Sequence, residues 1–207
     1  MDKKRIAIIE DHPIMLDGLV AYFEKTGRWR VTGTASTLSQ AKTLLQGLMA
    51  DIVLLDIQLE DGWSLDIVPW FQAAQQAAVQ SSNPSRPILA IYSNYDDYAH
   101  VNAALGMGVR AYISKRRDEK ELEKALIAAL NGSIYIDNTA RVKLQTVKEL
   151  SSLLTKRETE ILCHVKNGFS NKQIAACLNI SPRTVENILS GVYDKTGIKT
   201  RLELQNL

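Results

Sequence analysis

The sequence predicts an α/β domain with a doubly wound, five-stranded parallel sheet, followed by a small all-α domain. Two observations support this prediction. The first 130 residues alternate between short, continuous apolar runs and helical patterns, which is typical of parallel strands covered on both faces. From Ser151 onward the pattern is helical throughout, with tight turns. We expect the first domain at residues 1–131, a linker at 132–150 and the second domain at 151–207.

Five apolar runs are the expected strands. They lie at residues 5–9, 30–35, 52–55, 88–92 and 111–114. Helical patterns follow them near residues 14–25, 38–49, 64–79, 97–106 and 119–131. Five strand–helix units in series imply right-handed crossovers and helices on both faces of the sheet. The linker has mixed character and no clear period, so we expect it to be helical only near its end.

The helices of the second domain carry clear boundary signals. Ser170 with Gln173 has the spacing of a capping box, and Ser181 precedes a proline at a first helical position. Gly197 is the expected end of the helix that begins at Pro182. Short helices joined by tight turns favour a helix-turn-helix.

Composition and charge narrow the class of protein. The 207 residues are 45% hydrophobic and 23% charged, as in ordinary globular domains. No run approaches the roughly 18 apolar residues of a membrane helix, and the N-terminus lacks the long apolar region of a signal peptide. We therefore expect a cytoplasmic protein without membrane association, in which Cys163 and Cys177 are buried, reduced residues.

Charge is unevenly distributed along the chain. Residues 1–130 contain 14 Lys/Arg and 16 Asp/Glu, whereas residues 131–207 contain 11 and 7. An acidic first part and a basic second part fit a control domain joined to a nucleic-acid binder.

Polar side chains follow four of the expected strands. Glu10 and Asp11 follow the first, Asp56 ends the third, Ser93 follows the fourth and Lys115 follows the fifth. Because the carboxyl ends of parallel strands share one edge of the sheet, we expect these groups to converge. Clustered carboxylates repel one another, and Mg²⁺ relieves that repulsion. A carboxylate nucleophile, a metal and a cation are the groups that phosphoryl transfer to aspartate requires.

Residues 5–131 resemble the receiver domain of two-component response regulators, with its CheY-like fold. The matching motifs lie at residues 8–13, 51–56, 91–97 and 108–115. The resemblance implies that Asp56 accepts a phosphoryl group from a sensor histidine kinase. It also implies that Mg²⁺ is held by Glu10, Asp11, Asp56 and the backbone carbonyl of Gln58.

The same resemblance implies a switch. Lys115 contacts the phosphoryl group, Ser93 moves toward it, and Tyr112 turns inward behind it. This sequence departs from the family where Arg116 and Arg117 follow the lysine, since relatives often have an acidic residue or proline next to it.

Residues 154–204 resemble the DNA-binding domain of the NarL/FixJ (LuxR-type) family. The matching motifs lie at residues 154–162, 168–175, 178–181 and 184–186. The resemblance places the helix that begins at Pro182 in the major groove. The residues expected to contact DNA phosphates are Lys172, Arg183, Thr184, Lys195 and Lys199. Those expected to reach base edges are Arg183, Glu186, Asn187 and Ser190.

Three readings of the whole chain follow. The first is a transcription factor in which phosphorylation of Asp56 switches homodimerisation and DNA binding. Its chemistry is limited to Mg²⁺-dependent self-phosphorylation and slow autodephosphorylation. The second is a phosphorylation-controlled regulator whose helix-turn-helix binds a protein, motivated by Glu186 and Asp194 on the reading helix. The third, a phosphatase of the haloacid dehalogenase type, requires Asp-x-Asp, but Gln58 occupies the second acidic position.

Overall fold

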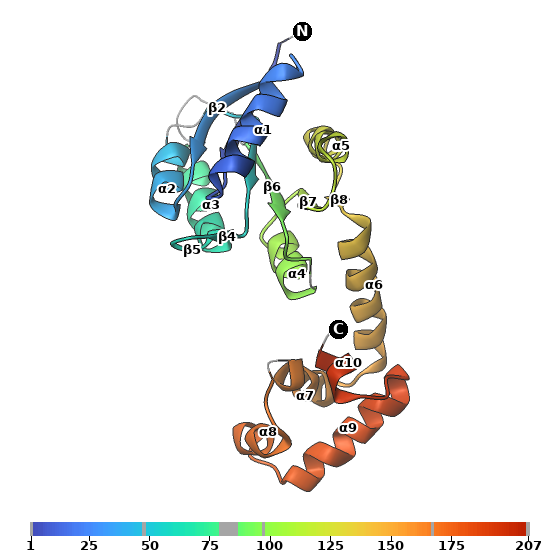
Figure 1. Cartoon of the computed structure of the whole chain (residues 1–207). Coiled ribbons are helices and arrows are strands. Elements are labelled where there is room, and N and C mark those ends of the chain that lie inside the picture. The colour runs from blue at the N-terminus through green and yellow to red at the C-terminus, as the bar shows by residue number, and fades with distance from the viewer. Residues whose placement is uncertain (1, 47–48, 79–86, 97, 167, 206–207) are drawn as a thin grey trace. The chain divides into compact units, whose positions relative to one another are not determined.

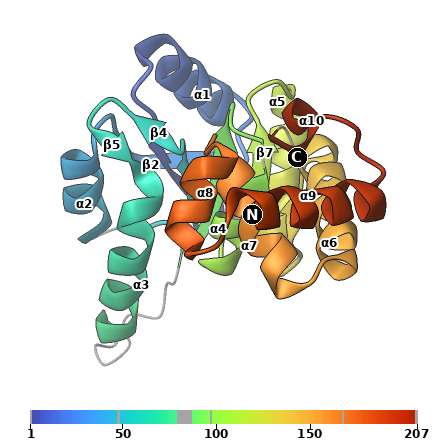
Figure 2. The ribbon, with the colours of Figure 1, turned by 90° about the horizontal axis from the view of Figure 1, so that it is seen from below.

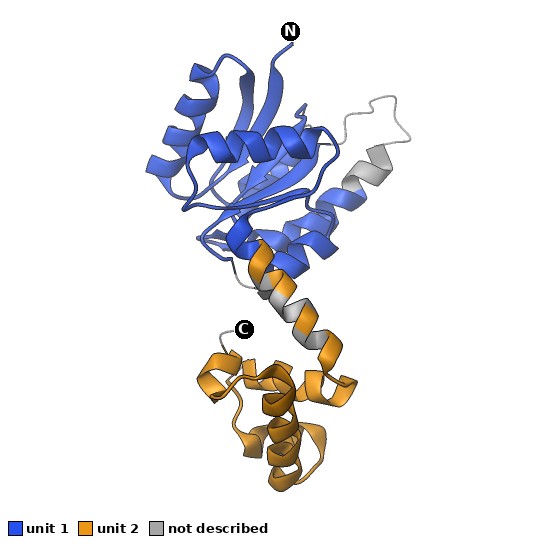
Figure 3. Ribbon diagram, turned by 90° about the vertical axis from the view of Figure 1, so that its right-hand side faces the viewer, with its two compact units in different colours: residues 1–140 blue, residues 141–207 orange. Residues whose placement is uncertain are grey.

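The computed structural model describes residues 2–46, 49–78, 87–96, 98–166 and 168–205. The chain divides into two compact units, residues 1–140 and 141–207 (Figure 3). Three predicted helices, at 38–49, 64–79 and 97–106, extend into positions 47–48, 79 and 97, which lie outside the described residues.

The first unit contains a parallel sheet with helices on both faces, which confirms the predicted α/β class. The strands are β1 (Lys4–Ile9), β2 (Trp29–Ala35), β3 (Ile52–Leu55), β6 (Ile88–Ser93), β7 (Ala111–Ser114) and β8 (Tyr135–Ile136), in the order β2-β1-β3-β6-β7-β8. The helices are α1 (Pro13–Lys25), α2 (Leu38–Gln46), α3 (Ile67–Ala78), α4 (Tyr98–Gly106) and α5 (Glu119–Leu130).

Alternate strand residues face opposite layers of helices. The core on one face joins strand residues such as Ile8 and Leu54 to Phe23 of α1 and Leu126 of α5. Figures 1 and 2 show α1 and α5 on this face and α3 and α4 on the other. β3 and β7 are buried at every position because helices cover both faces of the sheet, so their sequences are nearly continuous apolar runs.

The sheet contains six strands among the residues that the structure describes, so the prediction of five was wrong by one. β8 extends the β7 edge in parallel, with the Tyr135 amide donating to the Arg110 carbonyl at 2.9 Å and the Asp137 amide to the Tyr112 carbonyl at 2.8 Å. A strand of two half-buried residues carries no alternation that a sequence pattern could reveal. The segment 132–150 also contains most of a long helix, α6 (Asn138–Leu153), rather than a linker helical only near its end.

Short elements link β3 to α3. A two-stranded hairpin is formed by β4 (Gln58–Leu59) and β5 (Gly62–Trp63). A 3₁₀ turn, η1 (Ser64–Asp66), follows directly and leads into α3. These elements lie at the carboxyl end of β3, next to Asp56.

In the described residues, the second unit consists of α6 from Arg141 onward and four further helices: α7 (Lys156–Lys166), α8 (Asn171–Leu178), α9 (Pro182–Thr196) and α10 (Arg201–Gln205). The Ser170 capping box is present, the Ser181 side chain accepts from the Thr184 amide, and Gly197 ends α9 with a φ of 70°. One apolar core, which includes Ile161, Ile174, Val185, Leu189 and Leu204, holds these helices together.

The two cysteines correct an expectation. Cys163 and Cys177 are exposed, not buried. α7 buries Ile161, Leu162 and Val165, and α8 buries Ile174 and Ala175, so each cysteine lies off the buried stripe of its helix. Among the residues that the structure describes, no helix is long and apolar enough to cross a membrane.

Candidate functional site

Lys115 lies between two carboxylates at the carboxyl edge of the sheet. Its Nζ is 2.7 Å from Asp56 Oδ2 and 2.6 Å from Glu10 Oε2. The side chains of Lys115, Glu10 and Asp56 are only 6%, 2% and 7% exposed. Burial alone lowers the pKa of a lysine, but the hydrogen bonds that Lys115 donates to Asp56 and Glu10 outweigh it and raise the pKa of Lys115 above its usual value. The lysine is therefore held as a cation directly beside Asp56.

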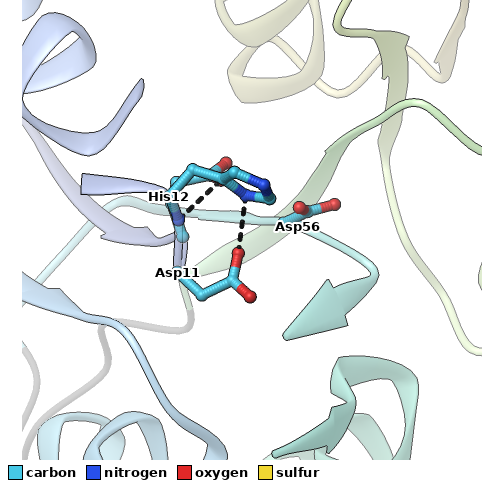
Figure 4. Close-up of side chains that lie close together, drawn as sticks. Asp11, His12 and Asp56 are labelled. Carbon is cyan, nitrogen blue, oxygen red and sulfur yellow. Dashed lines mark hydrogen bonds and ion pairs between the residues drawn. The ribbon is translucent and has the colours of Figure 1, made fainter. Parts of the chain in front are cut away.

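Asp11 completes an acidic cluster at this edge. Ligand atoms of Glu10, Asp11, His12 and Asp56 all lie within 4.8 Å of one another. Asp11 Oδ1 is buried and accepts no hydrogen bond from any described residue, although His12 Nδ1 lies 2.8 Å away as an ion-pair contact (Figure 4). A buried carboxylate oxygen without a donor is costly unless a cation binds it. The oxygen-rich donor set suits a hard divalent ion such as Mg²⁺.

Ser64 is a site residue that the sequence did not suggest. It is fully buried, and its hydroxyl donates to the backbone carbonyl of Asp56. The Asp56 amide in turn donates to the Ile9 carbonyl at 2.9 Å. Both backbone groups of Asp56 are thus fixed, so its side chain projects from a rigid support. A serine directly after the hairpin, eight residues beyond Asp56, has no motif that would have revealed this contact.

Ser93 and Tyr112 lie on neighbouring strands. Ser93 is buried at the end of β6, and its Oγ lies 3.4 Å from the Tyr95 amide. Tyr112 is fully buried on β7, with its hydroxyl donating to the backbone carbonyl of Tyr95. The tyrosine is therefore already directed inward, and it contacts the loop that follows Ser93.

A pocket of about 400 Å³ opens over Asp56. Its lining includes Asp11, Gln58, Ser93, Tyr95 and Lys115. The Tyr95 hydroxyl donates to the Gln58 side chain, and its ring packs edge-on against Trp63 at 5.5 Å. This open space is large enough for a phosphoryl group, and four residues that the sequence predicted for this edge line it: Asp11, Asp56, Ser93 and Lys115.

The two arginines after Lys115 have defined partners. Arg116 forms an ion pair with Asp96, and Arg117 forms one with Asp137, its Nε 2.6 Å from Asp137 Oδ2. Asp96 and Asp137 are both buried. The sequence marked these arginines as unusual but gave no sign of their partners, because the pairs join residues about 20 positions apart.

In the second unit, α8 and α9 form the helix-turn-helix, with Asn179 at a left-handed φ of 51° in the turn. α9 buries Val185, Leu189 and Val192, which leaves its opposite face exposed. The predicted DNA contacts that the structure leaves exposed are Lys172, Arg183, Thr184, Glu186, Asn187, Ser190, Lys195 and Lys199.

Several of these charges have local partners. Arg183 Nη1 lies 3.8 Å from Glu186 Oε2, one turn along α9, and the two side chains are 83% and 52% exposed. Lys195 Nζ lies 2.7 Å from Glu158 Oε2 of α7. The Lys195 hydrogen bond, followed by bonds from Thr155, lowers the pKa of Glu158 to about 2. Lys195 is thus tied to the helix behind α9.

Comparisons with known proteins agree with both halves of this description. Residues 6–127 match the response regulator receiver domain, and residues 152–207 match the bacterial regulatory proteins of the luxR family. The uncharacterized transcriptional regulatory protein YhcZ of Bacillus subtilis is 30% identical, over 96% of this chain and 92% of its own length. The response regulator protein VraR of Staphylococcus aureus is 27% identical, over 96% and 93%.

Solved structures share the fold. The RcsB–DNA complex has a TM-score of 0.71 at 21% identity and covers 99% of this chain and 97% of its own. RcsB from Salmonella enterica serovar Typhimurium, bound to the promoter rprA with a phosphomimetic, has a TM-score of 0.69 at 22% identity, over 99% and 97%. The receiver match spans more than half of the chain, and the LuxR-type match covers its second unit. The chain therefore belongs to the response regulators of the NarL/FixJ type, with a receiver domain and a LuxR-type helix-turn-helix.

Proposed function

We propose that a sensor histidine kinase phosphorylates this response regulator on Asp56 and that phosphorylation controls homodimerisation and DNA binding. The observation that carries the proposal is the placement of Lys115, whose Nζ lies 2.7 Å from Asp56 Oδ2 inside an acidic pocket. A buried cation at that distance neutralises charge on the transferred phosphoryl group. We assign residues 1–131 to the receiver, 132–150 to a linker whose first part completes the receiver sheet as β8, and 151–207 to the DNA-binding domain.

The residues of the pocket divide the work of phosphoryl transfer. An Asp56 carboxylate oxygen attacks phosphorus, the new O–P bond forms, and the N–P bond to the kinase histidine breaks. Lys115 neutralises the phosphoryl oxygens, and the Ser93 hydroxyl donates a hydrogen bond to one of them. Slow hydrolysis of the same acyl phosphate returns Asp56 to its unphosphorylated state. The chain acts only on its own phosphoryl group and turns over no separate substrate.

Mg²⁺ fits the donor set of this pocket. Glu10, Asp11, Asp56 and the backbone carbonyl of Gln58 would hold the ion. The buried Asp11 Oδ1, which accepts no hydrogen bond from a described residue, supports that assignment. When bound, the ion supplies positive charge that relieves repulsion between the carboxylates and the incoming phosphoryl group. His12 is exposed, and its nitrogen is a poor ligand for so hard a cation.

Phosphorylation of the full chain by acetyl phosphate tests the proposal. We expect wild-type protein to be labelled only with Mg²⁺ present and Asp56→Asn to remain unlabelled under the same conditions. Asp61→Asn, which changes an exposed acid in the nearby hairpin turn, is the matched control and should be labelled as the wild type is. Unchanged labelling of Asp56→Asn would show that another residue is the acceptor.

DNA is the proposed target of the second unit. The exposed face of α9 presents Arg183, Asn187 and Ser190 together. A bacterial regulator that binds DNA acts in the cytoplasm, and we propose that location for this chain. The protein–DNA complexes of RcsB support this assignment through a shared fold. A protein partner is the second candidate, because Glu186 and Asp194 place negative charge on the same helix. Binding to promoter DNA at low and moderate salt, with and without phosphorylation, separates the two, since a protein-binding domain would bind DNA in neither state.

A further inference from the structure

Arg117 links the loop of the phosphorylation site to the start of helix α6. Its guanidinium forms two parallel bonds with Asp137, Nε to Oδ2 at 2.6 Å and Nη2 to Oδ1 at 2.9 Å. Bidentate, charge-assisted pairs of this kind are strong and strictly oriented. The Asp137 side chain is 1% exposed and that of Arg117 is 38% exposed, so the carboxylate depends on this arginine as its counter-ion.

Asp137 also begins α6. Its Oδ1 accepts from the Thr139 amide at 2.6 Å, which satisfies a free donor in the first turn of the helix. Arg117 Nη2 donates to the Thr139 hydroxyl at 3.0 Å as well. The backbone amide of Asp137 donates to the carbonyl of Tyr112, the proposed switch residue. Asp137 therefore connects three elements: its amide bonds to β7, and its carboxylate bonds to the loop after Lys115 and to α6. The chain passes from the first compact unit to the second within α6 (Figure 3).

The loop between Lys115 and α5 is too short to absorb movement. The Lys115 amide donates to the Ser93 carbonyl at 2.9 Å, and the Arg117 amide donates to the Ser114 carbonyl at 3.0 Å. The next residue, Asp118, already caps α5 by accepting from the Glu121 amide at 2.8 Å. A shift of the backbone at Lys115 or Ser93 toward a phosphoryl group would therefore carry the backbone of Arg117 with it.

We propose that the Arg117–Asp137 ion pair couples the phosphorylation state of Asp56 to the first turn of α6, with Arg117 as a positioning residue. This inference rests on the proposed phosphorylation of Asp56. The two states are the paired arrangement described above and one in which the displaced guanidinium no longer meets both carboxylate oxygens. In the second state the buried Asp137 loses its counter-ion, and the cap of α6 is weakened.

The charge of the pair persists over the physiological pH range. Burial alone would raise the pKa of Asp137, but the bonds from Arg117 and from the Thr139 amide outweigh it and hold the pKa at about 2. The coupling therefore responds to displacement of the arginine and not to pH near neutrality.

Amide hydrogen exchange of the full chain tests the coupling, with Mg²⁺ and beryllofluoride standing in for the phosphoryl group. Fluorine NMR shows independently whether beryllofluoride is bound. In the wild type we expect binding to change exchange in residues 138–142 by about fivefold or more, the lower end of typical coupling between sites. In Arg117→Gln the ligand should still bind, but the change should fall below about twofold. Arg117→Lys, which keeps the charge but loses the bidentate geometry, should give an intermediate response.

Arg28→Gln is the matched control, because Arg28 forms an ion pair with Glu123 on the same unit. It should respond as the wild type does. If Arg117→Gln fails to fold, Asp137→Asn removes the negative charge of the same pair while keeping the size of the side chain, and its response should also be lost. A full response in folded Arg117→Gln or Asp137→Asn, or no response in wild type with bound beryllofluoride, overturns the coupling. Absence of beryllofluoride binding to the wild type would instead overturn the proposed function, and the coupling with it.

Discussion

The carboxyl edge of the sheet and the exposed face of α9 both carry many charges, but they neutralise them differently. At the sheet edge, residues from three strands place one buried lysine against two buried carboxylates. On α9, the pair of Arg183 and Glu186 is exposed and lies within one turn of the same helix. Solvent-exposed ion pairs contribute little to the stability of the fold, whereas removing one member of a buried ion-pair cluster strongly destabilises it. The first region is thus organised for one chemical event, and the second leaves its charges available to a partner.

The largest expected effect follows removal of the cation at the sheet edge. Lys115→Met should lower the rate of acetyl phosphate labelling at saturating Mg²⁺ by about 100-fold, the typical cost of losing one preorganised donor to a developing charge. Lys120→Met, at an exposed position of α5, should retain the wild-type rate. Without the lysine the carboxylates repel one another more strongly, so Mg²⁺ should also raise the Tm of Lys115→Met more than that of the wild type. Equal labelling rates would show that the cation has no role in transfer.

The next prediction tests whether DNA binding by the exposed face of α9 depends on the core residues that hold this helix in place. Leu189 is 3% exposed in the core of the second unit, so Leu189→Ala should cost about 2–5 kcal/mol in the free energy of unfolding. All three tryptophans lie in the first unit, so their fluorescence follows that unit alone, while circular dichroism follows both. DNA binding should weaken and Asp56 labelling should persist. Leu202→Ala, at an exposed position of α10, should change stability by less than about 0.5 kcal/mol.

A smaller effect distinguishes free from tethered charges near α9. Arg183→Ala should weaken DNA binding and reduce the slope of log affinity against log salt by about 1, as expected for one lost phosphate contact. Lys195→Ala should reduce the slope by less, because Glu158 already neutralises that lysine. Glu158→Gln should release Lys195 and strengthen binding, measured by fluorescence anisotropy. Equal slopes for Arg183→Ala and Lys195→Ala would show that Lys195 leaves Glu158 and contacts a phosphate when DNA binds.

The smallest effect is a pH dependence of the second unit. The pKa of Glu158 is lowered from 4.5 to about 2 in the folded chain. A lowered carboxyl pKa stabilises the fold above the unfolded value, and that stability is lost as pH falls through the folded value. The urea midpoint followed by circular dichroism should therefore fall between pH 4.5 and about 2, and Glu158→Gln should lose this component. An identical pH profile for the variant would exclude the Lys195 pair as its source.

The difference between the two regions also explains what the sequence could predict. The residues of the sheet edge were predictable because topology alone brings the ends of β1, β3, β6 and β7 together. Contacts set by side-chain reach were not, as for Ser64 on the Asp56 carbonyl or Arg117 on Asp137. The exposed face of α9 followed from helical spacing, but the tether of Lys195 to another helix did not. β8 was not predicted because a strand of two residues is too short to show an alternation of apolar and polar residues.

The position of β8 decides where the two modules can be separated. A fragment that ends at residue 131 would lose β8 and Asp137, expose the unpaired backbone edge of β7 and leave Arg117 without its carboxylate. Bare strand edges of this kind invite self-association. Chimeric regulators that exchange their output modules should therefore be joined within α6, beyond Thr139, so that the sixth strand and the cap of the helix stay with the receiver.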